Sequence, residues 1–256
     1  MSEPIQDIMD PARAKALCAT LGIPYRTPLP PYFHTIYFWR AYEEQDLGPD
    51  GHPKLGLEIP ELGYPRRMWA GGRITWHVPL QDGIRAEAHS AIVKKIEKTG
   101  HSGRFALVTQ RLDVRQKGQA VLSEERDLIY RPAAHPDDPA PAPLDVPSGK
   151  HLVDLKFSMP QLFRYSALTF NGHRIHYDQA FTKAEFGYDT VVVHGPLLAQ
   201  YLMLTAEYVL GGLSRFAYKA HAPVLQSDRV QIAHNGAQFW ISSDRAGLHM
   251  SASAEA

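Results

Sequence analysis

Several features that assign chains to broad protein classes are scarce in this sequence. Cys18 is the single cysteine, which excludes an intrachain disulfide and a cysteine-rich zinc site. The 27 basic and 27 acidic residues cancel, so there is no excess charge for coating a nucleic acid or an anionic membrane. No apolar run approaches the roughly 18–20 residues of a membrane helix, and the acidic first ten residues lack the apolar stretch of a signal peptide. We therefore expect a cytoplasmic protein with no nucleic-acid or membrane partner.

Proline is abundant in one place, and there it predicts a boundary. Residues 131–150 contain six prolines, which fit neither a helix interior nor a central strand and favour an extended tether. We therefore predict an N-terminal unit (1–131), a proline-rich linker (132–150) and a C-terminal unit (151–256). A long surface loop within one domain is the alternative, although loops of that length are uncommon in compact domains.

The N-terminal unit is expected to begin with a helix and to continue with strands. Asp10 is a typical N-cap, Pro11 suits the first helical position, and Gly22 follows the expected helix end. A short helix is expected over residues 41–47. Strand-like runs then follow at 72–77, 84–97, 103–116 and 119–130. The short turns between them predict an antiparallel meander.

The C-terminal unit contains the strongest helical run, residues 195–210, which is apolar on nearly every face and predicts a buried helix. A turn and a short strand are expected at 187–193, and residues 244–256 are expected to be frayed. Further strand-like runs lie at 213–220, 229–234 and 237–242. A buried helix wrapped by an antiparallel sheet is the hotdog arrangement, and two such units predict an α+β double hotdog.

The segment F-N-G-H-R-I-H-Y-D, residues 170–178, brings proton-transfer groups together. Histidine is the side chain most easily poised for proton transfer near neutral pH. His173 and His176 have Asn171 and Asp178 beside them, which favours a function over a purely structural role. The H-x-x-H spacing also permits a metal, but Asp178 and His194 would have to complete its ligands, and we predict no metal.

A second motif, V-V-V-H-G-P-L-L-A at residues 191–199, leads from an apolar run into the predicted helix. A helix N-terminus has unpaired N–H groups and partial positive charge. A thioester carbonyl placed at Gly195 would therefore be polarised, and negative charge on its oxygen would be stabilised. An ordinary strand-to-helix turn, with Pro196 near the first helical position, is the alternative.

A third motif, P-R-R-M-W-A-G-G-R at residues 65–73, is basic. Arginine forks suit carboxylates and phosphates, so Arg67 and Arg73 are candidate binding residues. A solvated charged loop is the alternative, but Trp69 beside two glycines favours a binding role. Further candidates for anion contact are Arg164, Arg174 and Arg215.

Together, the three motifs resemble those of the MaoC-like hotdog hydratases and dehydratases, which act on acyl thioesters. The motif at 65–73 resembles the branch that holds the mesaconyl-CoA and itaconyl-CoA hydratases and is similar to the mitochondrial 3-hydroxyacyl-thioester dehydratases. The resemblance covers roughly residues 24–241. It implies a degenerate N-terminal hotdog that shapes the acyl pocket, a catalytic C-terminal hotdog, a homodimer, and no cofactor, because CoA is part of the substrate.

The resemblance also implies roles for individual residues. Against the wider family's D-x-N-P-x-H pattern, His176 takes the place of the catalytic histidine, whereas Asn171 stands where the family has its aspartate. An amide cannot take a proton, so the usual Asp/His pair cannot operate unchanged. The expectation is that His176 is the base, that Asn171 orients the water, and that Gly195 binds the carbonyl. His173 is either a second proton-transfer group or a partner that orients His176.

The implied activity is hydration or dehydration of a short, dicarboxylic enoyl-CoA. Its distal carboxylate is expected on Arg67 or Arg73, and the other substrate-binding residues expected are Trp69, Arg174 and His194. A 3-hydroxyacyl-thioester dehydratase of fatty acid metabolism is the alternative enzyme. A hotdog thioesterase that recruits Asp178 or Glu185, or a non-catalytic acyl-CoA binder, is the alternative of another class.

Overall fold

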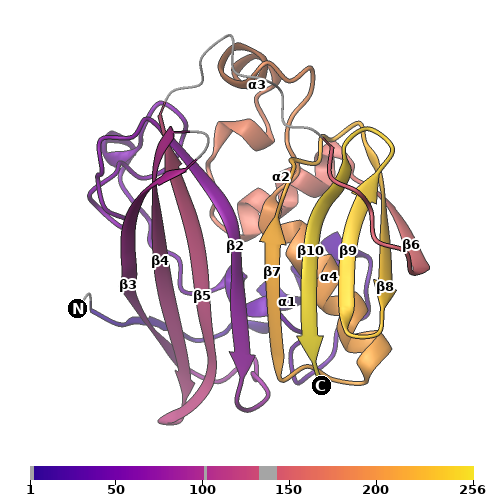
Figure 1. The fold of residues 1–256 in the computed structure, drawn as a ribbon. Helices are drawn as coiled ribbons and strands as arrows, with labels where there is room; N and C mark the ends of the chain where they lie inside the picture. The colour runs from indigo at the N-terminus through magenta and orange to yellow at the C-terminus, as the bar shows by residue number, and fades with distance from the viewer. Residues whose placement is uncertain (1–2, 101–102, 133–142) are drawn as a thin grey trace.

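A single antiparallel sheet organises the protein in the computed structural model, which describes residues 3–100, 103–132 and 143–256. Its strands are β1 (Ile5–Asp7), β2 (Arg66–Trp76), β3 (Ala86–Gly100), β4 (Gly103–Gln116), β5 (Gln119–Arg131), β6 (Lys150–Lys156), β7 (Arg215–Ala220), β8 (Arg229–Asn235), β9 (Gln238–Ser243) and β10 (Gly247–Glu255). They are ordered β1-β3-β4-β5-β2-β7-β10-β9-β8-β6. In Figure 1 the strands β2 to β5 stand on the left and β6 to β10 on the right.

Helices pack against one side of this sheet. They are α1 (Pro11–Leu21), α2 (Met159–Leu168), α3 (Gln179–Phe186) and α4 (Gly195–Leu210), with short 3₁₀ turns η1 (Phe33–Ile36), η2 (Glu44–Asp46) and η3 (Arg174–His176). Helix α4 lies against β7, β9 and β10, and α1 packs against α2 (Figure 1). None of the helices in these described ranges is long and apolar enough to cross a bilayer. The fold is an α+β double hotdog, as the sequence predicts.

The two halves of the chain meet where β2 pairs with β7, from Gly71 opposite Lys219 to Thr75 opposite Arg215. One hydrophobic core contains buried residues from both halves. Residues 133–142 of the predicted linker lie outside the described residues, and Leu144 forms a parallel bridge with Gly247. The division at residues 131 and 151 stays a prediction.

Local signals placed two helices correctly. The Asp10 carboxylate accepts a hydrogen bond from the Ala12 N–H, and Gly22 ends α1 in the left-handed conformation with φ of 71°. Helix α4 begins at Gly195 as predicted. Helices α2 and α3 and strand β6 were not predicted, although Ser158 and Asp178 cap the two helices with their side chains.

Four expectations were wrong. Strand β2 pairs with β5 and not with β3, so the meander comprises β3, β4 and β5 only. Residues 41–47 contain just the turn η2, and residues 187–193 make an isolated bridge at Val192 instead of a strand. Residues 244–256 are not frayed, because β10 lies between β7 and β9. Its alternate side chains Leu248, Met250, Ala252 and Ala254 are buried, which is the period of a strand with one face in the core.

A bulge in β2 decides which of its side chains face the helices. The register shifts between Trp69 and Gly71, so Trp69 lies opposite Leu128 and Gly72 opposite Arg126. Without the bulge, residues 67, 69 and 73 would share one face of the strand. With it, Arg67 and Trp69 share the inner face with Ile74, whereas Arg73 points to the outer face.

The inner face of β5 carries a buried ion cluster. The Glu124 carboxylate, which is fully buried, lies 2.8 Å from His34 Nε2 and 2.6 Å from the Arg126 guanidinium. Burial opposes ionisation of Glu124, but the charges of Arg126 and His34 hold the pKa of this carboxyl below its usual range. Removing one partner from such a cluster leaves an uncompensated group in the interior.

We predict that Glu124→Ala lowers the free energy of unfolding by about 3–5 kcal/mol, because Arg126 and His34 lose their carboxylate partner. Glu97→Ala, which removes an exposed ion pair with Arg104, is the control and should cost about 1 kcal/mol or less. Urea unfolding measures both. Similar small losses in the two variants would contradict the assigned role of the buried cluster.

Candidate active site

His176 lies at the end of η3 and is buried, and one of its ring nitrogens is hydrogen-bonded to the backbone. Its Nδ1 lies 2.7 Å from the backbone carbonyl of Val192. Because a carbonyl only accepts, Nδ1 carries the proton in the neutral ring and Nε2 keeps its lone pair. Burial lowers the pKa of His176 to about 3. The side chain is therefore a neutral imidazole with a free basic nitrogen.

His194 stacks on His176 with ring centroids 3.7 Å apart and an angle of 20° between the planes. Its Nε2 lies 2.7 Å from the hydroxyl oxygen of Ser166. Ser166 was not among the site residues predicted from the sequence. Its buried Nδ1 has no hydrogen-bond partner among the described residues. Burial lowers the pKa of His194 as well, so it also stays neutral.

The N-terminus of α4 lies directly after His194. Pro196 has no N–H and the Leu198 N–H donates to the His194 carbonyl at 3.2 Å, which leaves Gly195 and Leu197 as first-turn donors. The indole of Trp69 covers Gly195: a Cβ at this position would lie 2.6 Å from a ring carbon of Trp69. Only glycine permits this approach of β2 to the helix.

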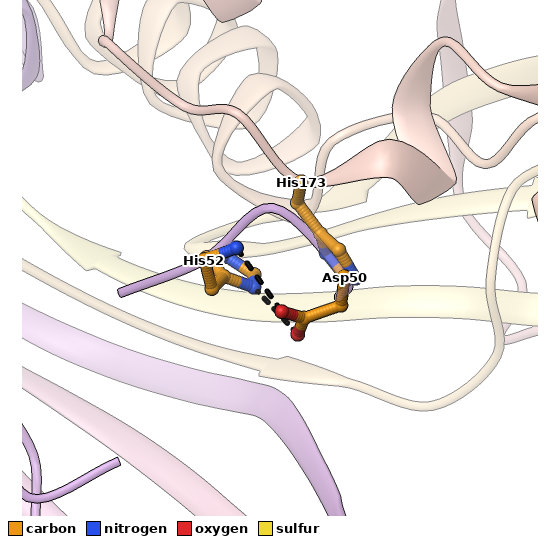
Figure 2. A group of neighbouring side chains, drawn as sticks. All are labelled: Asp50, His52 and His173. Atoms are coloured by element: carbon orange, nitrogen blue, oxygen red, sulfur yellow. Dashed lines mark hydrogen bonds and ion pairs between the residues drawn. The ribbon is translucent and has the colours of Figure 1, made fainter. Parts of the chain in front are cut away.

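Asp50 and His52 complete the histidine cluster from the first half of the chain. His52 Nδ1 lies 3.3 Å from Asp50 Oδ2, and the His52 ring contacts the His173 ring at a centroid distance of 4.1 Å. His173 in turn meets His176 edge to face at 5.4 Å. Figure 2 shows the Asp50 carboxylate and the two imidazoles pointing toward one another. Sequence reasoning missed both residues, although D-G-H-P at 50–53 places an acid and a histidine in one turn.

Backbone contacts hold this turn against the motif that contains His173. The Arg174 N–H donates to the Asp50 carbonyl at 2.8 Å, and the Arg174 guanidinium donates to the Pro49 carbonyl at 3.0 Å. A Cβ on Gly51 would collide with the Gly172 carbonyl oxygen. Two segments more than a hundred residues apart in sequence are thus joined at the site.

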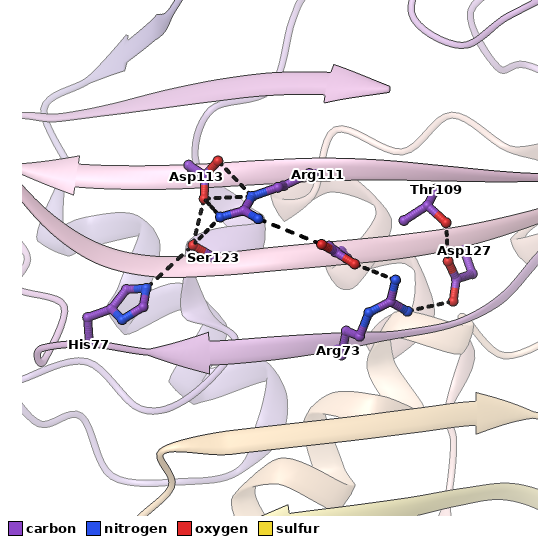
Figure 3. A network of polar contacts seen from close by, with 8 residues as sticks. Arg73, His77, Thr109, Arg111, Asp113, Ser123 and Asp127 are labelled. Carbon is purple, nitrogen blue, oxygen red and sulfur yellow. Dashed lines mark hydrogen bonds and ion pairs between the residues drawn. The ribbon is translucent and has the colours of Figure 1, made fainter. Parts of the chain in front are cut away.

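The bulge in β2 brings Arg67 to the site but not Arg73. Charge from Arg67 contributes, after burial, to lowering the pKa of His52 and His173. No carboxylate in the described ranges forms an ion pair with Arg67. Arg73 instead pairs with Glu125 and Asp127 on the outer face, in the network of Figure 3.

Other predicted site residues have local structural contacts. The Asn171 side-chain oxygen accepts a hydrogen bond from the His173 backbone N–H at 3.0 Å. Arg174 pairs with Asp178 at 2.8 Å. Asp178 also caps α3 by accepting from the Phe181 N–H at 2.9 Å, so it is not placed to join a metal set with His173. Arg164 is exposed, and Arg215 pairs with Glu255.

A different trio has the spacing of metal ligands. The donor atoms of Asp50, His52 and His173 lie within 4.8 Å of one another. The neighbouring positive charge of Arg67 disfavours a cation there. The hydrogen bond between Asp50 and His52 is instead typical of a carboxylate that orients an imidazole ring.

Known proteins share both sequence and fold with this chain. Residues 32–226 match the profile of the Htd2 family, hydroxyacyl-thioester dehydratase type 2. The chain is 40% identical over 232 residues to the mesaconyl-C(4)-CoA hydratase of Chloroflexus aurantiacus, covering 87% of this chain and 82% of that protein. It is 26% identical over 245 residues to the mitochondrial hydroxyacyl-thioester dehydratase type 2 of Schizosaccharomyces pombe, covering 84% and 81%.

Solved structures have the same fold at low sequence identity. HtdX of Mycobacterium tuberculosis superposes with a TM-score of 0.73 at 15% identity and covers 99% of each chain. A MaoC-like dehydratase of Phytophthora capsici gives a TM-score of 0.69 at 12% identity, covering 99% of this chain and 94% of its own.

We predict that His173 and His176 remain neutral across the range in which histidine usually titrates, about pH 5–8, because burial lowers the pKa of each to about 3. The unfolded chain takes up these protons near pH 6.5, so stability should fall as pH drops from about 6.5 toward 3. Imidazole nitrogen NMR, assigned with single His→Asn variants, measures the titration. Midpoints near 6.5 for both rings would contradict the buried, neutral cluster.

Proposed function

The chain belongs to the hydroxyacyl-thioester dehydratase type 2 family, and on this premise we propose that it adds water to the C2–C3 double bond of a short dicarboxylic enoyl-CoA, or removes water in the reverse direction. It is a hydro-lyase that acts on acyl thioesters. The observation that carries the proposal is the position of His176 beside the N-terminus of α4. A neutral base with a free nitrogen thus neighbours donors suited to a thioester oxygen.

The reaction follows from these two features. The thioester carbonyl accepts a hydrogen bond from the Gly195 N–H, which draws electrons from C3. His176 Nε2 takes a proton from water while the water oxygen bonds to C3. The electron pair of the C2–C3 double bond becomes an enolate, whose charge the helix N-terminus stabilises. The proton on His176 then passes to C2, which restores the neutral histidine, and dehydration is the same path in reverse.

Arg67 is the receptor we assign to the distal carboxylate of the acyl group. It shares the inner face of β2 with Trp69, whose ring covers Gly195, so it is near the carbonyl position. Its guanidinium has no carboxylate partner among the described residues, and such a fork binds a carboxylate in bidentate fashion. The mesaconyl-C(4)-CoA hydratase of C. aurantiacus, at 40% identity, supports an acyl group of this kind.

Other substrates remain testable alternatives. Itaconyl-CoA has the same pair of functional groups as mesaconyl-CoA. A straight-chain 3-hydroxyacyl thioester is supported by the family profile and by the S. pombe relative. Arg67 distinguishes the carboxylated acyl groups from the straight chain, because a straight chain offers it no carboxylate.

Further parts of the proposal concern the setting of the enzyme. We propose a homodimer that needs no cofactor besides the CoA of its substrate. We also propose a cytoplasmic location, which rests on the composition of the chain. The S. pombe relative is mitochondrial by name, so fractionation of the native cell decides this point.

The direct test is to add mesaconyl-CoA, itaconyl-CoA and crotonyl-CoA separately and to follow the ultraviolet absorbance of the enoyl thioester, with a thiol reagent in parallel. Loss of absorbance without thiol release supports a hydratase, and the preferred acyl group identifies the substrate. Thiol release would show a thioesterase. Binding without any change would show a silent acyl-CoA binder.

We predict that His176→Ala lowers kcat by about 10²–10⁴-fold, the usual contribution of a positioned acid/base. His151→Ala, which removes a half-exposed histidine on β6, is the matched control and should keep full activity. Circular dichroism confirms that each variant is folded. Retained activity in folded His176→Ala would overturn its assignment as the base.

Arg67→Ala should lower kcat/KM for a carboxylated enoyl-CoA by about 10–100-fold, the size expected for lost hydrogen bonds to a charged group. Turnover of crotonyl-CoA should change far less, because it has no distal carboxylate. Arg73→Ala is the control, since Arg73 pairs with Glu125 and Asp127 on the other face. An equal loss for both substrates would contradict the assignment of Arg67 as the carboxylate receptor.

A further inference from the structure

We propose that Asp50 and His52 are positioning residues of the active site and that they supply, through His173, the carboxylate that position 171 lacks. The inference rests on the proposed hydratase function and assigns a catalytic contribution to the N-terminal half of the chain. It concerns a turn, residues 48–53, that lies outside the C-terminal catalytic unit expected from sequence.

A continuous series of contacts leads from the carboxylate to the base. Asp50 Oδ2 is 3.3 Å from His52 Nδ1, the His52 and His173 rings meet at 4.1 Å, and the His173 and His176 rings meet at 5.4 Å. The donor atoms of Asp50, His52 and His173 all lie within 4.8 Å of one another. The Asp50 carboxylate is therefore next to the imidazoles of His52 and His173 (Figure 2). The His173 ring in turn contacts the His176 ring, so it connects the carboxylate to the base.

Asp50 is an ionised group in this cluster. Burial opposes its ionisation, but hydrogen bonds from the side chain and backbone of His52 hold the pKa of Asp50 below its usual range. Its negative charge raises the pKa of His173, against the larger lowering effect of burial and the charges of His52 and Arg67. The negative charge of Asp50 thus faces both the His52 ring and the His173 ring.

Position 171 cannot supply this charge. Asn171 is neutral, and its side-chain oxygen already accepts the His173 N–H at 3.0 Å. The same hydrogen bond holds the backbone of His173, so the amide orients that histidine while Asp50 contributes the charge. The turn that carries Asp50 is fixed by the Arg174 N–H bond to the Asp50 carbonyl and by the close approach of Gly51 to Gly172.

The chemistry explains why a charge is useful at this distance. When His176 takes a proton from water, an imidazolium forms in a buried site where burial alone disfavours it. The anionic Asp50 stabilises that transient positive charge. The contacts of His52 and His173 hold the carboxylate in its position relative to His176. No proton needs to leave the cluster, because His176 returns the proton to C2.

The test compares wild type, Asp50→Asn, Asn171→Asp and the double variant in the enoyl-CoA hydration assay. An asparagine at 50 can still accept the His52 backbone N–H, which Asp50 Oδ1 does at 3.1 Å, so the turn is kept and only charge is lost. We expect Asp50→Asn to lower kcat by about 10–100-fold, because the protonated His176 loses stabilisation equivalent to about one to two pKa units, with little change in KM. The decisive expectation is that Asn171→Asp raises the activity of the Asp50→Asn protein but not that of wild type.

Controls separate charge from structure. Glu58→Gln removes an exposed carboxylate from the same loop region, whose charge raises the pKa of His52. This variant should keep kcat within a few-fold of wild type. If Asp50→Asn does not fold, His52→Asn provides a second variant that breaks the ring contact with His173 and should also lower kcat.

Each outcome decides the proposal. Unchanged kcat in folded Asp50→Asn, or no rescue by Asn171→Asp, overturns it while leaving the hydratase function intact. Loss of wild-type activity in EDTA with recovery on Zn²⁺ addition would overturn it in favour of a metal held by the same trio. No hydration by the wild-type protein with any enoyl-CoA would reject the proposed function itself.

Discussion

The pairing of β2 with β7 is the contact on which the rest of the structure depends. It joins the two halves into one sheet, and it requires small residues, because a Cβ on Gly71 would meet the Tyr218 carbonyl and a Cβ on Gly72 would meet the Tyr218 hydroxyl. The bulge beside these glycines turns Arg67 and Trp69 inward. Trp69 then covers Gly195, so one short segment of the first half shapes the helix N-terminus that belongs to the second.

Burial of the histidine rings is the second physical factor that determines the chemistry of the site. It keeps His173, His176 and His194 neutral, which makes His176 a proton acceptor and makes its protonated form costly. A site of this kind needs compensating charge close by. The turn that carries Asp50 is held by backbone contacts to Gly172 and Arg174 and places a negative charge beside these rings.

Sequence reasoning succeeded where the signal was local. Asp10, Pro11 and Gly22 define α1, the apolar run after Gly195 defines α4, and both agree with the structure. It failed where distant segments decide the outcome. Residues 244–256 were expected to fray, but β10 is held by β9, which directly precedes it, and by β7, from which β8 and β9 separate it in sequence. The bulge that sends Arg73 to the outer face is visible only in the register with β5. Asp50 and His52 lie more than a hundred residues before His173, and no periodic pattern links them.

The proposed reaction requires the acyl group to lie between the two halves, on the inner side of the sheet. The most direct measurement is a crystal structure of the His176→Ala variant with mesaconyl-C(4)-CoA bound. We expect the thioester oxygen about 2.7–3.1 Å from the Gly195 nitrogen and the distal carboxylate on Arg67. An acyl group bound on the outer face, in the open groove of about 450 Å³ lined by His77, Arg111 and Ser123, would contradict it.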